Sequence, residues 1–285
     1  MSVHDRDVFV SHIELALGEF LGSINVLRDL KWTRWMFLGV CKARHAAKQM
    51  LQLADKVLDA YRQNPNPDPN TLIHMLANDS DYESDEDRTR DMITFIFAGF
   101  DTTAHSIAWA LLELARNPEE QDLLRSALMK NNKSSSSKEE ARQYQELKNV
   151  TRETLRLYTP AALGSIRTLG TNVPLPGTKF ILPADSHCIM PFYVLLRNGN
   201  YFEDPDSFVP SRWNDPSEAS LKAFMPFSMG SRNCPAQALA HAEIMIVMAR
   251  LLLGYEFTVE QESKKEYMVT LKPIGTKLRV KAIAK

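Results

Sequence analysis

A helical segment from about Glu86 to Arg116 is apolar on nearly every side between Met92 and Leu114. A helix with one apolar stripe lies at a protein surface, whereas a helix that is apolar all round has to be covered by other elements. Apolar stretches such as Ile93 to Phe100 fall well short of the roughly 18 residues that a membrane span needs. The segment therefore predicts a fully buried helix.

The composition supports a folded chain with a core of that kind. Apolar residues make up 44% of the 285 residues, which is ordinary globular usage. Lys plus Arg number 34 against 35 Asp plus Glu, a net charge of −1, so no long-range attraction to nucleic acid exists and no nucleic-acid partner is expected. The charged N-terminus lacks the apolar run of a signal peptide, and we expect neither signal nor membrane anchor in this chain.

Further helices are expected on both sides of this segment. Helical spacing, N-terminal caps and proline or glycine stops mark them. The expected helical regions are 13–61, one that starts at Asn117-Pro118, 139–159 before Pro160, and 235–253 before Gly254. The proline-rich stretch 64–69 and the acidic stretch 79–87 are expected to be connectors.

A small β part interrupts the helices. Turn residues alternate with strand-forming residues between 174 and 196, where 187–196 is the clearest expected strand. Residues 202–229 show little periodicity, and 269–280 predicts a terminal hairpin around Pro273-Ile274-Gly275. Residues from about 130 to 140, with four consecutive serines, predict a flexible insert. The expected fold class is mainly α with a small β part.

Cys234 is a candidate for chemistry because it precedes Pro235 where an irregular segment enters the last helix. At such a helix start, the amides and the dipole favour a thiolate over a thiol. The alternative is a small buried cysteine. Cys41 and Cys188 are the other two cysteines, and the wide spacing of the three forms neither a disulfide framework nor a Cys-x-x-Cys metal site. Any of them that acts does so singly, in a reducing compartment.

The residues around Cys234 form the pattern Phe227-x-x-Gly230-x-Arg232-x-Cys234-x-Ala236. This pattern resembles the haem-ligand loop of the cytochrome P450 family. The resemblance implies that the Cys234 thiolate binds the iron of haem b axially and pushes electron density towards it. It also implies that Phe227 packs against the sulfur side of the haem, that Gly230 permits a tight turn, and that Arg232 meets a haem propionate. Ala236 stands where the family usually has glycine.

Glu153-Thr154-Leu155-Arg156 is a second match to the family. An exposed pair at this spacing contributes only a few tenths of a kcal/mol and carries little information. Apolar residues on more than one face of this helix predict that the pair is buried, and a buried pair needs further partners. The resemblance supplies Arg212, from the segment Phe-x-Pro-x-Arg-Trp. It implies that these three residues hold the Cys234 loop in place and do not react.

The third match, residues 98–103 with the sequence Ala-Gly-Phe-Asp-Thr-Thr, lies in the middle of the long apolar helix. Glycine within a helix costs roughly 0.5 to 1 kcal/mol, and such local conflicts often mark function. The alternative is a packing glycine with hydroxyls bonded back to helix carbonyls. The segment resembles the oxygen-activation motif of the same family, which implies that Asp101 is the proton-relay acid and that the Thr102 hydroxyl positions oxygen and water.

Arg167 lies after the Pro160 break, where the family places another propionate-binding arginine. The alternative is an ordinary surface arginine. Arg197 follows a leucine where the family commonly has a His-Arg pair, so no role is carried over to it. The seven histidines form no metal-spaced cluster, and His105 is expected to be structural or at the surface.

The resemblance runs from about Trp32 to the C-terminus and implies a cytochrome P450-like fold, with residues 1–285 as one partial catalytic domain. We expect an N-terminal truncation, because the family's membrane anchor, first strands and early propionate contact have no counterpart. No signal or anchor assigns a location. The endoplasmic reticulum membrane is expected for a full-length eukaryotic relative.

The implied function is that of a haem-thiolate monooxygenase, which inserts one oxygen atom from O2 into a lipophilic organic substrate. Electrons would come from a separate NADPH-dependent reductase or a ferredoxin, since the sequence has no Gly-x-Gly-x-x-Gly fingerprint for a dinucleotide. Two alternatives remain open. One is a haem-thiolate isomerase or dehydratase of oxidised lipids, and the other is a truncated chain without catalytic activity.

Overall fold

The computed structural model describes residues 38–130, 145–267 and 269–283. The chain divides into two compact units, Met1–Phe100 and Asp101–Lys285, and each is described by itself. The expectations for residues before 38, and for the serine-rich insert beyond residue 130, lie outside the described residues.

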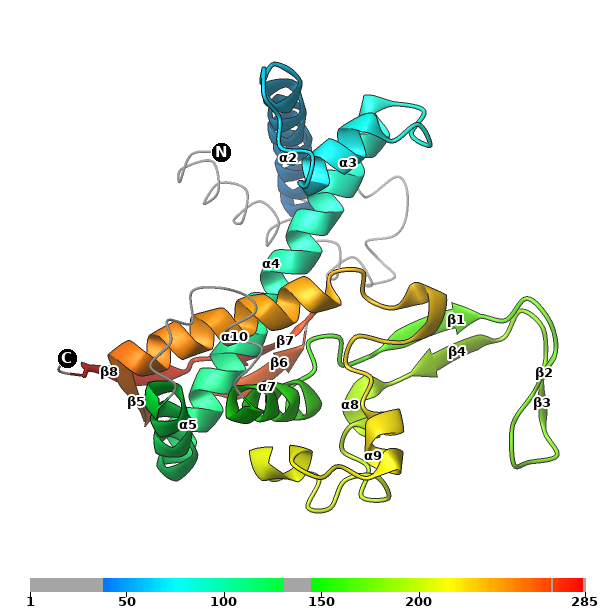
Figure 1. The fold of residues 1–285 in the computed structure, drawn as a ribbon. Coiled ribbons are helices and arrows are strands. Elements are labelled where there is room, and N and C mark those ends of the chain that lie inside the picture. Colours follow the sequence, from blue (N-terminus) through cyan, green and yellow to red (C-terminus); the bar gives the residue numbers. More distant parts are fainter. Residues whose placement is uncertain (1–37, 131–144, 268, 284–285) are drawn as a thin grey trace. The chain divides into compact units, whose positions relative to one another are not determined.

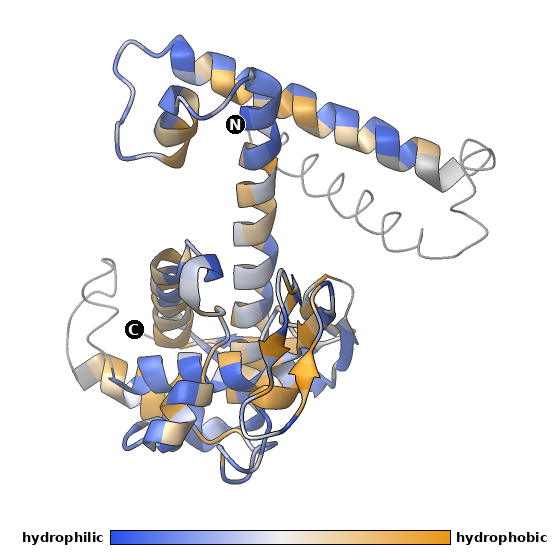
Figure 2. Cartoon of the chain, turned by 90° about the vertical axis from the view of Figure 1, so that its right-hand side faces the viewer, coloured by the Kyte–Doolittle hydropathy of each residue, from blue (hydrophilic) through white to orange (hydrophobic). Residues whose placement is uncertain are grey.

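The first unit consists of helices α2 (Leu38–Arg62) and α3 (Leu72–Asn78) and the beginning of α4 (Asp85–Arg116) (Figure 1). Polar and apolar residues alternate along α2 (Figure 2), and its buried residues pack against Leu76 of α3 and Met92 of α4. Helix α3 is absent from the expected elements, because seven residues carry too little periodicity to be recognised. Thr71 caps it by accepting a hydrogen bond from the backbone N–H of His74.

The second unit packs four helices around one apolar core: the second half of α4, α5 (Pro118–Lys130), α7 (Gln145–Leu157) and α10 (Gln237–Gly254). Each helix presents residues spaced three or four apart to this core, as helical periodicity requires. The core contains Ala110 and Leu114 of α4, Leu124 and Leu128 of α5, Leu147 and Val150 of α7, and Ile244, Met245, Met248 and Leu252 of α10.

Helix α4 is present as expected, but it is buried over only part of its length. Trp109 and Leu112 are fully buried, whereas Ala98, Gly99 and Phe100 are exposed. The expectation of burial on every side is therefore wrong for these three residues. An apolar pattern shows that a helix face avoids water, but it does not show what covers that face.

Two helices, α4 and α10, are long and apolar enough to cross a membrane by length and composition alone. Helix α10 places Ile244, Met248 and Leu252 in the core of the second unit. Core packing thus accounts for its apolar composition.

The described β part consists of four two-stranded antiparallel sheets. The pairs are β1 (Ser165–Thr168) with β4 (His187–Met190), β2 (Val173–Pro174) with β3 (Ile181–Leu182), β5 (Tyr255–Gln261) with β8 (Lys277–Ala282), and β6 (Lys264–Tyr267) with β7 (Leu271–Ile274). The fold class, mainly α with a small β part, is confirmed.

Two expected β features differ in the structure. The strand that begins at His187 ends at Met190, and α8 (Phe192–Leu195) follows, because a helical turn places both Phe192 and Leu196 in one core cluster. The terminal segment is not a simple hairpin, since its two strands pair with different partners. Leu271 of β7 and Phe257 of β5 belong to different core clusters, and this separates the two sheets.

The segment between β4 and α10 also contains short helices that its weak periodicity hides. These are η3 (Pro210–Trp213), α9 (Glu218–Ala223) and η4 (Gly230–Arg232). Ser217 caps α9, since its hydroxyl accepts the backbone N–H of Ser220 at 3.0 Å.

Trp109 connects α4 to the C-terminal strands. Its side chain is fully buried and stacks on Tyr158 with 4.0 Å between ring centroids. Its indole N–H donates to the carbonyl of Leu271 at 3.0 Å. This one side chain therefore contributes both apolar packing and a buried hydrogen bond.

We expect Trp109→Phe to lower the free energy of unfolding by about 1–3 kcal/mol, because the buried carbonyl of Leu271 loses its donor. Urea unfolding followed by circular dichroism measures the change. Tyr255→Phe, at an exposed aromatic residue, is the control and is expected to unfold like the wild type. Equal midpoints for Trp109→Phe and wild type would show that the indole hydrogen bond contributes nothing.

Candidate functional site

Cys234 lies on a closed loop just before α10. Its backbone N–H donates to the carbonyl of Phe227 at 2.9 Å, which closes the loop from 227 to 234. Gly230 has φ +73°, in the left-handed region that favours glycine. A Cβ added at Gly230 would meet no protein atom within 4 Å, so within the protein it is the backbone conformation that calls for glycine.

The start of α10 differs slightly from expectation. The N-cap is Ala236, and the first helical hydrogen bond runs from the N–H of Ala240 to the carbonyl of Ala236. Pro235 is therefore not the first helical residue, because residues 235 and 236 still form a turn. Cys234 lies two residues before the cap, half-buried at the end of the loop.

The Cys234 loop is attached on two sides. The ring of Phe227 lies 4.9 Å from the ring of His241 on α10, tilted by 52°. The hydroxyl of Ser228 lies 3.2 Å from that of Ser165 on β1. The side chain of Arg232 is exposed.

Arg167 lies on β1, opposite Cys188 in the register of the sheet. Residues two apart on a strand point to the same face, so Arg167 shares its face with Ser165, which contacts the Cys234 loop. Its guanidinium donates to the carbonyl of Ile166 at 2.8 Å. The structure thus places Arg167 on the strand that borders this loop.

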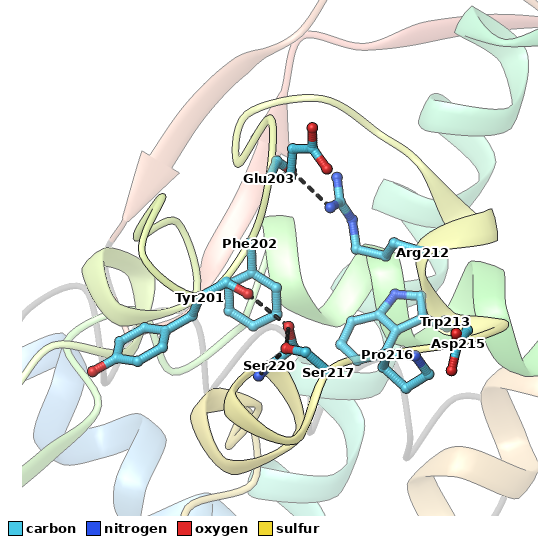
Figure 3. A pocket seen from close by; sticks show the side chains of 9 residues that line it. All are labelled: Tyr201, Phe202, Glu203, Arg212, Trp213, Asp215, Pro216, Ser217 and Ser220. Atoms are coloured by element: carbon cyan, nitrogen blue, oxygen red, sulfur yellow. Dashed lines mark hydrogen bonds between the residues drawn. The ribbon is translucent and has the colours of Figure 1, made fainter.

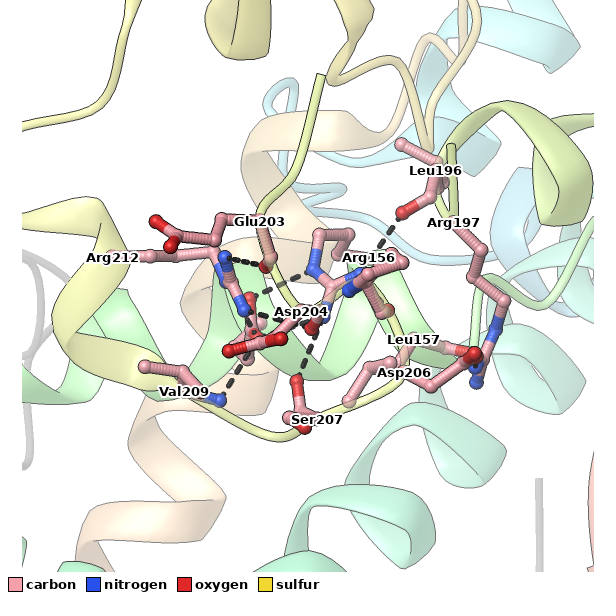
Figure 4. A network of polar contacts seen from close by, with 12 residues as sticks. Arg156, Leu157, Leu196, Arg197, Glu203, Asp204, Asp206, Ser207, Val209 and Arg212 are labelled. Atoms are coloured by element: carbon pink, nitrogen blue, oxygen red, sulfur yellow. Dashed lines mark hydrogen bonds and ion pairs between the residues drawn. The ribbon is translucent and has the colours of Figure 1, made fainter. Parts of the chain in front are cut away.

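Figure 4 shows Arg156, Arg212 and Val209 in a buried polar network, and all three donate to the carboxylate of Glu153. Arg156 donates to both of its oxygens, Nε to Oε2 at 3.0 Å and Nη2 to Oε1 at 2.8 Å. Arg212 Nε donates to Oε1 at 2.9 Å. Glu153 and Arg156 are fully buried. The structure therefore brings together the three residues expected to support the Cys234 loop.

Two donors to this carboxylate are additional to the expected pair of arginines. The indole of Trp213 donates to Oε2 at 2.9 Å, and the backbone N–H of Val209 donates to Oε1 at 2.9 Å. The tryptophan is part of the Phe-x-Pro-x-Arg-Trp segment, so its N–H could have been predicted from the sequence as a further donor. No sequence signal marks a backbone N–H such as that of Val209.

Arg156 also ties the network to the segment that follows α8. Its Nη atoms donate to the carbonyls of Leu196 at 3.0 Å, Pro205 at 2.5 Å and Ser207 at 3.0 Å. Every terminal nitrogen of this guanidinium is thus used, as a buried arginine requires.

Arg197, to which the resemblance gave no role, has a structural one. It forms an ion pair with Asp206, donates to the carbonyl of Leu157 at 2.8 Å at the end of α7, and lies 4.6 Å over the ring of Tyr193. These contacts hold the end of α7 against the segment after α8.

Asp101 and Thr102 lie on α4 at the start of the second unit, both half-buried. The hydroxyl of Ser106 donates to the carbonyl of Thr102 at 2.8 Å. The hydroxyl of Thr270, outside every motif, donates to Asp101 Oδ2 at 2.5 Å. Burial raises the pKa of Asp101, but the hydrogen bonds from His105 and Thr270 and the charge of Lys272 outweigh burial and lower it.

A cavity of about 320 Å³ lies between η3, α9 and residues 201–203 (Figure 3). Phe202 and Trp213 line it together with polar residues, Arg212 and Ser220 among them. None of its lining residues belongs to the Cys234 loop, so this cavity is not the site of a cysteine-bound cofactor.

The family model for Cytochrome P450 matches residues 7–280. The chain belongs to the cytochrome P450 family. The resemblance drawn from the motifs is therefore confirmed, and with it haem, with iron bound by a cysteine thiolate, as the cofactor of the family.

Individual relatives agree with this assignment. Cytochrome P450 4d2 of Drosophila melanogaster is 35% identical over 178 residues, 61% of this chain and 35% of that protein. The human Ultra-long-chain fatty acid omega-hydroxylase is 34% identical over 200 residues, 67% of this chain and 37% of that protein. Cytochrome P450 4A10 of Rattus norvegicus is 31% identical over 220 residues, 76% of this chain and 42% of that protein. The chain thus spans about two fifths or less of the length of these relatives.

The crystal structure of the cytochrome P450DA heme domain has the same fold. Its TM-score is 0.82 at 19% identity, over 97% of this chain and 61% of that chain. The expected cytochrome P450-like fold is confirmed.

The residues around Cys234 fit a haem. The cysteine is half-exposed, and the adjoining Met229 and Leu239 expose 60% and 47% of their surface. A flat apolar ring over this loop would remove such side chains from water. A single axial ligand is enough for haem iron, so the lack of any cluster of three His, Cys, Asp or Glu metal ligands in the described part of the chain is compatible with it.

We expect Glu153→Gln to destabilise the protein by about 3–5 kcal/mol, because Arg156 would be left buried without a counter-charge. Chemical denaturation measures the loss. The matched control is Glu218→Gln, which removes an exposed carboxylate paired with Lys222 on α9 and is expected to leave the unfolding curve unchanged. Similar curves for the two variants would show that the Glu153 network adds no stability.

Proposed function

We propose that the chain acts as part of a haem-thiolate monooxygenase, with residues 1–285 in one catalytic domain. Such an enzyme inserts one atom of O2 into a lipophilic organic substrate and reduces the other to water. The observation that carries the proposal is the half-exposed Cys234 at the end of a closed loop, in a chain that matches the family over residues 7–280.

The residues of the loop have distinct parts in this proposal. Cys234 would bind the iron as a thiolate, and Phe227, held by His241, would pack against the sulfur side of the ring. Arg232 and Arg167 are the cationic residues suited to the two propionates. Haem supplies the oxygen and one-electron chemistry when it is bound.

Asp101 and Thr102 would handle the protons that oxygen reduction consumes. Asp101 accepts hydrogen bonds and has a lowered pKa, so it is ionised at neutral pH and has to take up a proton before it can give one. Thr102 would position water with its hydroxyl.

The proposal includes a substrate class and an electron donor. Similarity to the human Ultra-long-chain fatty acid omega-hydroxylase supports a long-chain lipid as substrate. As electron donor we propose a separate NADPH-dependent reductase or a ferredoxin. We assign no location to this chain and propose the endoplasmic reticulum membrane for a full-length eukaryotic relative.

We expect Cys234→Ser to abolish thiolate ligation, because a neutral alcohol is a poor ligand for iron. The measurement is the absorption spectrum of the haem-supplied protein after reduction and treatment with carbon monoxide. Cys41→Ser and Cys188→Ser are the matched controls and should keep the thiolate-type Soret band. Retention of that band in Cys234→Ser would overturn the assignment, and no haem uptake by the wild type would favour a chain without catalytic activity.

We expect Thr102→Ala to leave haem binding intact but to divert electrons from product to hydrogen peroxide. The measured quantity is the ratio of product to reductant consumed, in a catalytically competent preparation with one accepted substrate. Thr94→Ala is the control, since that hydroxyl bonds to the carbonyl of Arg90 on the same helix at 3.0 Å. Equal coupling in Thr102→Ala and wild type would favour an isomerase or dehydratase, which needs no proton delivery to dioxygen.

A further inference from the structure

Asp101, Thr270 and His105 form one chain of polar contacts. Thr270 Oγ1 lies 2.5 Å from Asp101 Oδ2 and 3.1 Å from His105 Nδ1. The direct distance from His105 Nδ1 to Asp101 Oδ2 is longer, 3.5 Å. The hydroxyl of Thr270 is therefore the closest link between the carboxylate and the imidazole.

The surrounding structure holds these three side chains in place. Asp101, His105 and Trp109 are spaced by four residues and so lie on one face of α4. Trp109 donates to the carbonyl of Leu271, and the N–H of Leu271 donates to the carbonyl of Pro160 at 3.0 Å. Thr270, the residue before Leu271, is buried with 5% of its surface exposed. Its hydroxyl is thus held between β7, which begins at the next residue, and α4.

The hydrogen-bonding capacity of a hydroxyl restricts where the protons can be. A threonine has one proton to donate, and an ionised carboxylate can only accept. While Asp101 is ionised, Thr270 donates to it and has no second proton to give, so Nδ1 of His105 has to carry a proton. That proton faces Thr270 Oγ1 at 3.1 Å and Asp101 Oδ2 at 3.5 Å. If both protons move one bond along the chain, Asp101 becomes a carboxylic acid that donates to Thr270, and Nδ1 becomes an acceptor. The two arrangements need no movement of heavy atoms.

We propose that His105 reloads Asp101 with a proton through the hydroxyl of Thr270. The step is balanced: Nδ1–H of the imidazolium breaks, Thr270 gains that proton and gives its own to Asp101 Oδ2, and His105 is left as neutral imidazole with Nε2–H. Because 22% of its side chain is exposed, His105 can regain the proton from hydronium or a buffer acid in the bulk solvent, and water or the buffer base is left. This inference rests on the proposed function, in which Asp101 gives up a proton in each catalytic cycle.

Other charged groups face the chain and set its balance. Lys272 on β7 favours the ionised form of Asp101 by its charge. Glu266 on β6 lies 3.8 Å from Lys272 and partly offsets that charge. Neither lies between His105 and Asp101. Their charges therefore affect how strongly Asp101 holds the proton, but they do not transfer it.

Nuclear magnetic resonance of the full chain tests the proton chain without turnover. We expect ¹⁵N shifts of His105, assigned by their loss in His105→Gln, to show a protonated Nδ1 at neutral pH, because the ring tautomer is set by its hydrogen bond. We expect the pKa of the Asp101 carboxyl, assigned with Asp101→Asn, to rise by about one unit in Thr270→Val, which removes one donor. Thr270→Ser keeps the hydroxyl and should restore both values.

The matched control is Thr276→Val, in the turn after β7. The buried hydroxyl of Thr276 has no hydrogen-bond partner among the residues that the structure describes. It should leave His105 and Asp101 unchanged. A bare Nδ1 beside an ionised Asp101 in the wild type would overturn the proposal. This measurement does not depend on the folding of any Thr270 variant. An unchanged Asp101 pKa in folded Thr270→Val would overturn it as well.

Turnover measurements test whether this proton transfer matters for catalysis. In a competent preparation, Thr270→Val should reduce turnover at least about tenfold, and Thr270→Ser should restore it, as for loss of an acid-base group. The resonance data can support the proton transfer while Thr102→Ala and Thr270→Val both leave coupling and turnover unchanged. In that case the proposed function fails, and the contacts of His105 take no part in catalysis. If Thr102→Ala uncouples the enzyme and Thr270→Val does not slow it, only the reloading proposal is overturned.

Discussion

The carboxylate of Glu153 is fully buried and accepts hydrogen bonds from four groups: Arg156, Arg212, the indole of Trp213 and the backbone N–H of Val209. A buried charge is costly unless its lone pairs are all used, so each donor is required where it is. Three of the donors come from residues 209–213, which form only the short 3-10 helix η3. The hydrogen bonds to this carboxylate therefore fix the position of that segment in the fold.

The same network extends towards the Cys234 loop. Arg156 binds the carbonyls of residues 196, 205 and 207, and Trp213 packs with Phe192 and Phe202 in one apolar cluster. The chain then passes through α9 into the closed loop, which is attached to β1 by Ser228 and to α10 by Phe227. Glu153 lies some eighty residues before Cys234 in the sequence, and we propose that its network supports the loop that carries the cysteine.

Helix α4 illustrates how one face can serve both stability and chemistry. Trp109 on this face is buried and bonded to the C-terminal strands, whereas Asp101, two turns earlier, is half-buried and bonded to the same strands through Thr270. Trp109 holds β7 through Leu271, and Thr270, just before β7, orients the carboxylate of Asp101. The proton-transfer role that we propose for Asp101 needs such support, because small errors in hydrogen-bond geometry weaken transfer strongly.

Residue type and spacing were sufficient for the long helices α4 and α10 and for the Cys234, Glu153 and Asp101 motifs, because these signals are local or rest on rare residue patterns. Helices α3 and α8 and the separate pairing of β7 and β8 were not recognisable, since short elements are fixed by the clusters into which their side chains pack. The contact of Thr270 with Asp101 spans 169 positions. No local pattern marks a threonine as the partner of an acid that far away, so only the packing of the C-terminal strands on α4 decides it.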